Sequence, residues 1–507
     1  MSNVTDLLLR MRKKGVRLWK DGERLCFEAP QGGLDSHERG QLLAHKTALM
    51  ALLERRSITA EAEPPIQRRS QSDCRIPITF SQRWMWNLHE LDRNPNRLGF
   101  IQRAFHLRGT LDVDMLSQSL SNLVRRHEAL RTRLIRVDAD ITQRVDADAP
   151  SVLEIIDLTG STGDSTEQRV LHVAKHLAYG KTPTHEAPLF EPHLLRIDQQ
   201  HHVLIVTLHH IVSDFASFGI LSRDLFAMYS ERKTKRPASL PILSVQFPDY
   251  ALWQQATQPF WLEKHSAYWD RALSGAAHLR VKASAPQGDT TASRFTLPFD
   301  LGKSLTDKLR QCSQIYRTTL VMSIFAIYVA TVMNCYRVDD VVIPFLTLGR
   351  HLPELREVVG FFGVPLLIRI ELDRVETFAD LLERVTGEYA RACEHHDCCR
   401  IAAQLPEPYF VWNPMFNWLP QEFDSPIAAP SEELRLTPLY LESMPDDIRW
   451  RGELRVDLSE TPTGVKGVFG FRPDSFTPSA AERVRNSFES FAEQLVNQPN
   501  ARFSIFK

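Results

Sequence analysis

Residues 203–229 read VLIVTLHHIVSDFASFGILSRDLFAMY, and this stretch decides how we expect the chain to fold around its site. It begins with alternating β-branched and aliphatic residues, which predict a strand, and after Asp214 continues with apolar residues at three- and four-residue spacing, which predict a helix. Because neighbouring side chains in a strand point to opposite faces, His209 and His210 cannot serve the same purpose. We expect one to pack within its own layer and the other to project from the strand end into a cleft.

Asp214 falls in the expected first turn of that helix, with Ser213 as a candidate cap. A carboxylate there gains from the helix dipole and should stay ionised. The motif HHxxxD alone leaves an alternative open, in which both histidines are structural and Asp214 merely caps the helix. We predict no metal site, because adjacent strand histidines diverge and no Glu or third His follows at helical spacing.

The composition excludes several classes of protein. The 507 residues predict two or three domains, and 43% hydrophobic with 24% charged residues is ordinary for a soluble globular chain. A net charge of −1 argues against a general nucleic-acid binder. Seven scattered cysteines fit a reducing compartment. The longest nearly apolar run, residues 320–333, is too short to cross a bilayer, so we expect a cytoplasmic protein without membrane or nucleic-acid partners.

Residues 1–57 read as a separate small unit. Two helical patterns flank two short alternating runs, and Asp21-Gly22 between those runs predicts a β-hairpin. The unit holds 11 Lys or Arg against 7 Asp or Glu. This excess is either a solvated face or a basic, open-edged hairpin that accepts an acidic tail by strand addition and charge pairing. Residues 58–76 lack periodicity and read as a linker.

The N-terminal unit resembles the β-hairpin docking domain of assembly-line synthetases. The resemblance includes Gly-Val-x-Leu-Trp at residues 15–19, Ala-Pro at 29–30 and His45-Lys46. It implies that the unit receives a short acidic motif at the C-terminus of an upstream protein. The candidate docking residues are Arg12, Lys13, Lys14, Arg17, Trp19, Lys20, Arg24 and Lys46.

From Pro77 to the C-terminus the chain resembles a condensation domain of non-ribosomal peptide synthetases, in the chloramphenicol acetyltransferase-like superfamily. The matching stretches are TFSQRWMW at 79–86, RHEALRTRL at 126–134, HHIVSD at 209–214, FPDYALWQ at 247–254 and NPMFN at 413–417. Three positions depart from the family pattern. Trp84 stands where the family prefers Arg, Phe215 replaces a Gly, and residues 360–366 lack the Asn and Thr of the family segment.

The resemblance implies an α/β (α+β) fold with two chloramphenicol acetyltransferase-like lobes, residues 77–255 and 256–507, in a V around a tunnel. It makes His210 the base or positioning group, and it makes His209 and Asp214 structural, with Arg350 as the partner of Asp214. The candidate tunnel residues are Ser213, Phe215, Ser217, Gly363, Val364 and Asn413. No cofactor is expected to be bound by the chain itself, since the phosphopantetheine arm comes from the partner carrier protein.

Several functions stay open. No adenylation domain or carrier serine motif is visible before Lys507, so we expect a stand-alone enzyme that takes an acyl chain from an upstream carrier. Release of that chain as an ester or amide, as in the chain-release enzyme of the enacyloxin type, is the first hypothesis. Amide-forming elongation with a carrier-bound amino acid, a carrier-independent acyl-CoA transferase and an idle recruiting module are the alternatives. A missing DxxxxD motif disfavours heterocyclisation, and a docking domain in place of an upstream carrier domain disfavours epimerisation.

One further cluster of metal-capable residues, CEHHDCC at 393–399, has neither a paired C-x-x-C nor an H-x-x-x-H. We interpret it as a helix end or loop.

Overall fold

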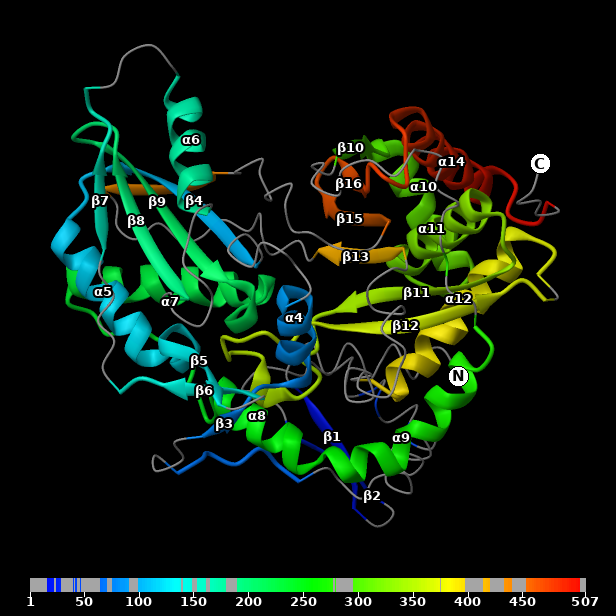
Figure 1. Cartoon of the computed structure of the whole chain (residues 1–507), viewed down its shortest axis with the longest axis horizontal. Coiled ribbons are helices and arrows are strands. Elements are labelled where there is room, and N and C mark those ends of the chain that lie inside the picture. The colour runs from blue at the N-terminus through cyan, green and yellow to red at the C-terminus, as the bar shows by residue number, and fades with distance from the viewer. Residues whose placement is uncertain are drawn as a thin grey trace. The chain divides into compact units, whose positions relative to one another are not determined.

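The structure is a computed structural model (Figure 1). It divides the chain into two compact units, Met1–Pro65 and Ile66–Lys507. It describes residues 16–21, 24–28, 40, 42, 46, 64–70, 75–90, 99–137, 140–147, 153–160, 165–178, 189–276, 279, 295–373, 375–396, 414–419, 433–439 and 453–501.

The N-terminal unit contains the hairpin that Asp21-Gly22 predicts. Strand β1 (Arg17–Asp21) pairs antiparallel with β2 (Arg24–Glu28), and Asp21 lies opposite Arg24. The prediction of a hairpin is therefore confirmed. Val16 and Leu42 are buried, whereas Lys46 is exposed on a helical segment. The candidate docking residues Arg12, Lys13 and Lys14 lie outside the described residues.

The first sheet of the larger unit has the order β14-β4-β9-β8-β7. Its strands are β4 (Phe100–Gly109), β7 (Glu154–Asp157), β8 (Phe190–Arg196), β9 (His201–His209) and β14 (Leu434–Leu439). Strand β9 is buried along its whole length because helices cover both faces of the sheet. Leu204, Val206 and Leu208 pack with helices α5 (Val113–Arg126) and α7 (Phe215–Thr234), while Val203 and Ile205 pack with α6 (Thr166–Ala178). Successive side chains of β9 thus point to opposite faces of the sheet, as they do in any strand.

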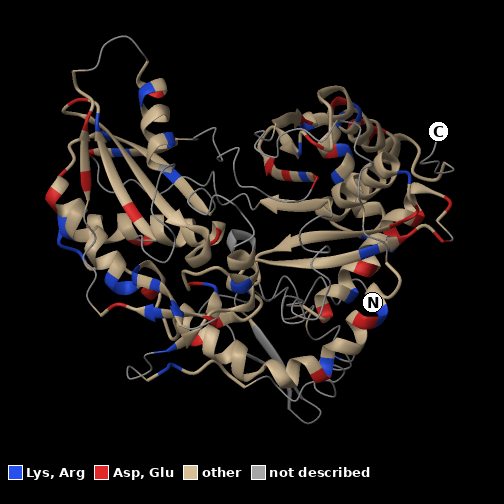
Figure 2. Cartoon of the chain, in the orientation of Figure 1, with Lys and Arg blue, Asp and Glu red and all other residues tan. Residues whose placement is uncertain are grey.

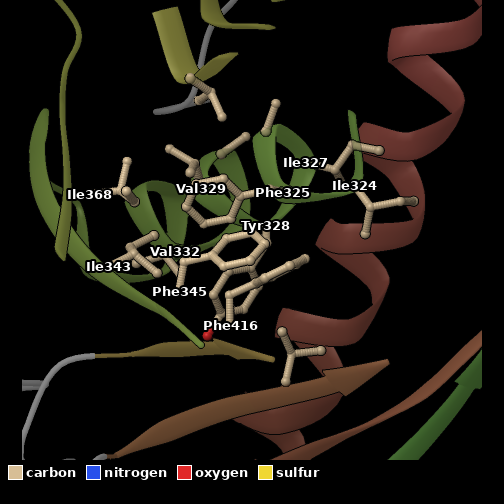
Figure 3. Packing of buried hydrophobic residues seen from close by; sticks show 14 of the residues in the cluster. Ile324, Phe325, Ile327, Tyr328, Val329, Val332, Ile343, Phe345, Ile368 and Phe416 are labelled. Carbon is tan, nitrogen blue, oxygen red and sulfur yellow. The ribbon is translucent and has the colours of Figure 1, made fainter. Parts of the chain in front are cut away.

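The second sheet has the order β10-β16-β15-β13-β11-β12. Its strands are β10 (Phe295–Asp300), β11 (Asp340–Thr347), β12 (Val364–Glu371), β13 (Met415–Leu419), β15 (Leu454–Thr461) and β16 (Gly464–Phe471). Helices α10 (Gly302–Ile315), α11 (Leu320–Tyr336), α12 (Phe378–Glu394) and α14 (Pro478–Asn497) pack against it. Figure 3 shows Phe325 and Tyr328 of α11 meeting Phe345 and Phe416 of the sheet. In Figure 2 the strands β11, β12 and β13 are uncharged over most of their length, as buried strands should be.

The two sheets are not built from separate halves of the sequence. Strand β14 follows β13 along the chain but pairs antiparallel with β4, so that Leu434 lies opposite Gly109 and Leu439 opposite Ala104. Leu355, Phe361 and Phe362, which lie between β11 and β12, pack in the hydrophobic core of the first sheet. A division of the chain at residue 255 therefore does not separate the two sheets with their cores. Strand β14 and the residues between β11 and β12 follow residue 255 in the sequence but belong to the first sheet and its core.

The remaining elements connect and brace the sheets. A small third sheet has the order β3-β6-β5, formed by β3 (Ile76–Pro77), β5 (Thr132–Val137) and β6 (Asp140–Val145). Helices α4 (Phe80–Glu90), α8 (Phe247–Ala256) and α9 (Gln258–Leu273) complete the unit, together with the short turns η2 (Glu128–Arg131), η3 (His210–Val212) and η4 (Pro353–Leu355).

Within the described residues, no single helix is long and apolar enough to cross a membrane. One pair, α10 with α11, meets the criteria of length and composition together and is bent by 102°. Residues Leu320–Met333 of α11 are almost entirely buried in the core of the second sheet.

Residues 66–70 are part of the larger unit, although their composition reads as a linker. Ile66 is buried, and the Arg69 guanidinium lies 2.5 Å from Glu128 Oε2 and 3.2 Å from Asp249 Oδ1. Arg68 reaches the same two carboxylates, at 3.0 and 3.5 Å. Because Asp249 is fully buried and Glu128 nearly so, these arginines balance buried charges that would otherwise be underpaired.

We expect Arg69→Met to lower the free energy of unfolding by about 3 kcal/mol, because it leaves buried carboxylates underpaired. Urea denaturation of the full chain measures this loss. Arg83→Met is the matched control, since Arg83 pairs with the exposed Asp140 and its removal should cost at most about 1 kcal/mol. Equal losses for the two variants would contradict the structural role of Arg69.

Candidate active site

The strand and helix of residues 203–229 place the two histidines in different surroundings. Strand β9 ends at His209, and the turn η3 begins at His210. The His209 ring is fully buried, meets the Phe100 ring edge-on at 4.8 Å, and its Nδ1 accepts a hydrogen bond from the Ile211 N–H at 3.0 Å. His210 is partly exposed. His209 is therefore the histidine that packs within its own layer, and His210 is the more exposed of the two.

The hydrogen bonds of His210 fix the protonation of its ring. Its backbone N–H donates to Gly99 O at 2.5 Å, and its Nδ1 lies 2.7 Å from Ser213 O. A carbonyl oxygen can only accept, so Nδ1 carries the proton, and the neutral ring presents the lone pair of Nε2. Burial lowers the pKa of His210 below its ordinary value of about 6.5. At neutral pH the ring is therefore uncharged and able to accept a proton.

Aromatic side chains surround the His210 ring. Phe361 meets it edge-on at 4.9 Å between ring centroids, and Phe215 meets it edge-on at 6.2 Å. Trp84 of α4 stacks on Phe361 at 6.5 Å and packs against both hydrophobic cores. The ring of His210 thus lies beside side chains from the start of α7 and from the loop before β12, and Trp84 of α4 supports the second of these.

Asp214 and Arg350 form a buried ion pair between segments far apart in the sequence. Arg350 Nη2 lies 2.8 Å from Asp214 Oδ1 and 3.0 Å from Oδ2, and both side chains are less than one-tenth exposed. Asp214 Oδ1 also accepts hydrogen bonds from the backbone N–H and the hydroxyl of Ser217, at 2.8 and 2.7 Å. The carboxylate therefore orients the first turn of α7, the turn that directly follows His210.

Asp214 itself is the N-cap of α7, so the prediction of Ser213 as the cap is wrong. The Ser213 hydroxyl instead donates to His209 O at 3.0 Å, which closes the turn between strand and helix. Asp214 and Ser217 together form a capping box.

Arg350 is held by more than its carboxylate partner. Its Nη1 donates to the carbonyls of Leu355 at 2.6 Å and Val358 at 2.5 Å, and its guanidinium lies 4.4 Å from the centre of the Phe362 ring. The preceding Gly349 has φ +63°, and a Cβ there would lie 1.8 Å from Phe362 O. Only glycine fits at that position, because any side chain would collide with backbone.

The remaining candidate tunnel residues differ in exposure. Ser213 and Ser217 are fully buried, and Val364 is buried in the core of the second sheet. These three side chains therefore pack inside the protein. Phe215 and Gly363 are partly exposed. Asn413 lies outside the described residues.

Sequence reasoning does not place three side chains at the site. Trp84 stands out in the sequence only as a departure from the family pattern, and nothing there singles out Phe361. Gln82 is buried, and its amide donates to Ile211 O at 2.9 Å, which holds the turn beside His210. Gln82 lies within the matching stretch 79–86, but no spacing connects that stretch to residue 210.

Residues 393–396 of the cluster lie where helix α12 ends. His395 stacks on Tyr268 at 3.9 Å, and its Nδ1 lies 2.9 Å from Nδ1 of His265. Within the part of the chain that the structure describes, no group of three or more His, Cys, Asp or Glu side chains could hold a metal ion. Residues 397–399 lie outside that part.

Two stretches of the chain match known protein families. Residues 73–504 match the condensation domain family, and residues 4–55 match the TubC N-terminal docking domain. The chain therefore belongs to the condensation domain family, the acyl-transferring enzymes of non-ribosomal peptide synthetase systems. Its N-terminal unit is a docking domain of the TubC type.

The chain matches only a small part of each of its relatives, which are much longer proteins. The chain is 29% identical over 463 residues to the malpinin synthetase of Mortierella alpina, a match that covers 87% of the chain and 6% of the relative. It is 30% identical over 435 residues to the isonitrile lipopeptide synthase of Mycobacterium tuberculosis, a match that covers 82% of the chain and 17% of the relative. The chain thus spans less than a fifth of the length of either protein.

Solved structures show the same fold. The X-domain from teicoplanin biosynthesis superposes with a TM-score of 0.75 at 22% identity, covering 88% of the chain and all of that structure. The EpoB cyclization-docking bidomain from Sorangium cellulosum superposes with a TM-score of 0.69 at 19% identity, covering 98% of each chain. The mixed α/β fold is that of the chloramphenicol acetyltransferase-like condensation domains.

Proposed function

We propose that the enzyme transfers an acyl chain, polyketide or peptidyl, from the phosphopantetheine thioester of an upstream carrier protein to an alcohol or amine. His210 is the group that handles the proton of the acceptor. The observation that carries this proposal is the bond from His210 Nδ1 to Ser213 O, which leaves Nε2 as the proton acceptor. The match to the condensation domain family supplies the reaction type.

The chemistry needs little covalent help from the protein, because the thioester is already activated. The acceptor's N–H or O–H donates to Nε2 of His210 as its N or O attacks the thioester carbonyl carbon. The C–S bond then breaks, and the pantetheine sulfur leaves as a thiol after it takes up a proton. The lowered pKa of His210 keeps the ring neutral and ready at physiological pH.

We propose that the reaction releases the finished chain as an ester or amide, in the manner of the chain-release enzyme of the enacyloxin type. The N-terminal docking domain supports delivery of the donor by a separate protein. Amide-forming elongation with a carrier-bound amino acid is the alternative outcome of the same chemistry, and an acyl-CoA transferase would not need the docking domain.

The experiment that tests the proposal uses intact-protein mass spectrometry. A carrier loaded with an acyl chain is incubated with the full-length enzyme and with free alcohols, free amines and an aminoacyl carrier in turn. We expect the mass of the acyl group to leave the donor carrier in the presence of an acceptor. Loss to a free small molecule supports release, and gain on the second carrier supports elongation. No loss with any acceptor would contradict the proposed function.

Deletion of residues 1–57 tests the docking proposal, in which the basic hairpin binds an acidic C-terminal motif of the upstream carrier protein. We expect the truncated enzyme to lose at least about tenfold in kcat/KM with the carrier-bound donor, because local concentration through docking is lost. It should retain its rate with a soluble acyl-pantetheine. The truncation keeps Arg68 and Arg69, which brace the larger unit.

Steady-state kinetics with both donors measure this difference. The full-length enzyme with a carrier whose acidic C-terminal tail is removed is the matched control and should behave like the truncation. Equal losses with both donors would contradict a docking role for the N-terminal unit.

A further inference from the structure

We propose that Phe215 and Phe361 form an aromatic clamp around His210 that selects the acceptor. The clamp favours an alcohol or amine whose nucleophile-bearing carbon is flanked by carbon and hydrogen only. It disfavours an acceptor that carries a carboxylate on that carbon. This inference rests on the proposed function of His210 as the group that accepts the acceptor's proton.

The clamp consists of two phenylalanine rings on different elements. Phe215 is the first residue of α7, directly after the N-cap Asp214, and Phe361 lies in the loop before β12. Their rings meet His210 at interplanar angles of 82° and 66°. Phe361 is buried against Trp84, whereas Phe215 is partly exposed. Phe361 is thus fixed by packing, and Phe215 is the more exposed of the two rings.

The clamp acts on the acceptor because of where the nucleophile must lie. A nucleophile that gives its proton to His210 Nε2 has to come within hydrogen-bond distance of that atom, about 3 Å. The atoms next to the nucleophile then fall within reach of the rings that contact His210. The phenylalanine rings offer no hydrogen-bond donor of the kind a carboxylate needs, so a carboxylate placed beside them loses hydration without gaining a hydrogen bond from them.

A cation lies near one side of the clamp. The Arg103 guanidinium carbon is 5.9 Å from the centre of the Phe215 ring and 5.9 Å from that of Phe218. Attraction of this cation to both rings holds Phe215 in place. An acidic acceptor that reached Arg103 would be favoured instead of disfavoured, so the test below distinguishes the clamp from an arginine site for carboxylates.

Phe215 sets this chain apart from the condensation domain pattern, which has Gly at this position. The proposed selectivity is therefore specific to chains that carry a phenylalanine there. Phe215→Gly therefore removes one of the two rings and leaves the backbone free to keep its turn. Phe215→Leu keeps an apolar side chain of similar reach. Together the two variants separate loss of the ring's bulk from a general disturbance of α7.

The test compares matched acceptors at fixed donor. Isopropylamine and alanine differ by one methyl replaced with a carboxylate, and 2-propanol and lactate form the same pair for alcohols. We expect the full-length enzyme to prefer the uncharged member of each pair by at least tenfold in kcat/KM. Phe215→Gly should reduce that preference by at least threefold, and Phe215→Leu should restore most of it. Phe260→Ala is the control, a partly exposed phenylalanine on α9 beside Lys264.

A second readout detects an effect on His210 itself. Phe215→Gly should raise the pH at which kcat/KM falls on the acid side, because water gains access to the ring, and Phe260→Ala should leave that pH unchanged. A preference for the carboxylate member, no transfer to the uncharged member, or an unchanged ratio in Phe215→Gly would overturn the clamp. Full activity of His210→Ala would instead overturn the proposed function, so the two failures are distinguishable.

Discussion

Replacement of His210 by alanine is expected to lower kcat by about 10²–10⁴-fold, the range that a positioned general base contributes. The expected size follows from the geometry, in which Ser213 O fixes the ring and leaves Nε2 as the proton acceptor. The neighbouring ring at the end of β9 cannot take over this role, because His209 is fully buried beside Phe100. Product formation from a donor-loaded carrier, followed by liquid chromatography and mass spectrometry, measures the loss.

The His210→Ala protein should stay folded and still bind its donor carrier. His176→Ala is the matched control, since His176 is exposed on α6 and its removal should leave turnover unchanged. Turnover by His210→Ala at the rate of the unmodified enzyme would remove this residue from the reaction.

Breaking the ion pair between Asp214 and Arg350 is expected to be the most destabilising substitution at the site. Asp214→Asn or Arg350→Met should lower the free energy of unfolding by about 3–5 kcal/mol, because each leaves a buried charge without its partner. Arg350→Met also frees the carbonyls of Leu355 and Val358. Urea denaturation measures the loss, and activity should fall together with the folded population.

The control for that experiment is an ion pair of lower burial. Arg310 lies 2.5 Å from Glu460 with its side chain 40% exposed, and Arg310→Met should cost at most about 1 kcal/mol. The double variant Asp214→Asn/Arg350→Met should cost less than the sum of the two single losses, since the two residues interact. If the two single losses in free energy of unfolding add up in the double variant, or if the single variants are as stable as the parent chain, the ion pair between Asp214 and Arg350 does not stabilise the protein as proposed.

The local parts of the fold could be predicted because their signals lie within a few residues of one another. The Asp21-Gly22 turn specifies a hairpin by its own backbone preferences. The β-branched and aliphatic residues 203–208 specify a strand, and the opposite directions of neighbouring side chains in a strand separate His209 from His210. These features need no knowledge of distant partners.

The parts that escaped prediction depend on distant contacts. Residues 64–70 have the composition of a linker, yet Arg69 pairs with carboxylates 59 and 180 residues away. Strand β14 pairs with β4 although the two strands are more than 300 residues apart in the sequence. Pro438 is tolerated in β14 because this strand lies at the edge of its sheet. Phe361 contacts His210, and Trp84 of α4 stacks on Phe361 while it packs against both cores, which no spacing in the sequence reveals.

The most direct test of the central claim is a rapid-quench single turnover across pH. A donor-loaded carrier is mixed with a saturating acceptor and excess enzyme, and the intact mass of the carrier gives the rate of acyl transfer. Because burial lowers the pKa of His210, and the base acts when deprotonated, the rate should stay constant through neutral pH and fall only below about pH 6.5. His210→Ala should show a slow rate without this step. A rate that rises as pH falls through this range, or the same profile in His210→Ala, would contradict the role of His210 as the proton acceptor.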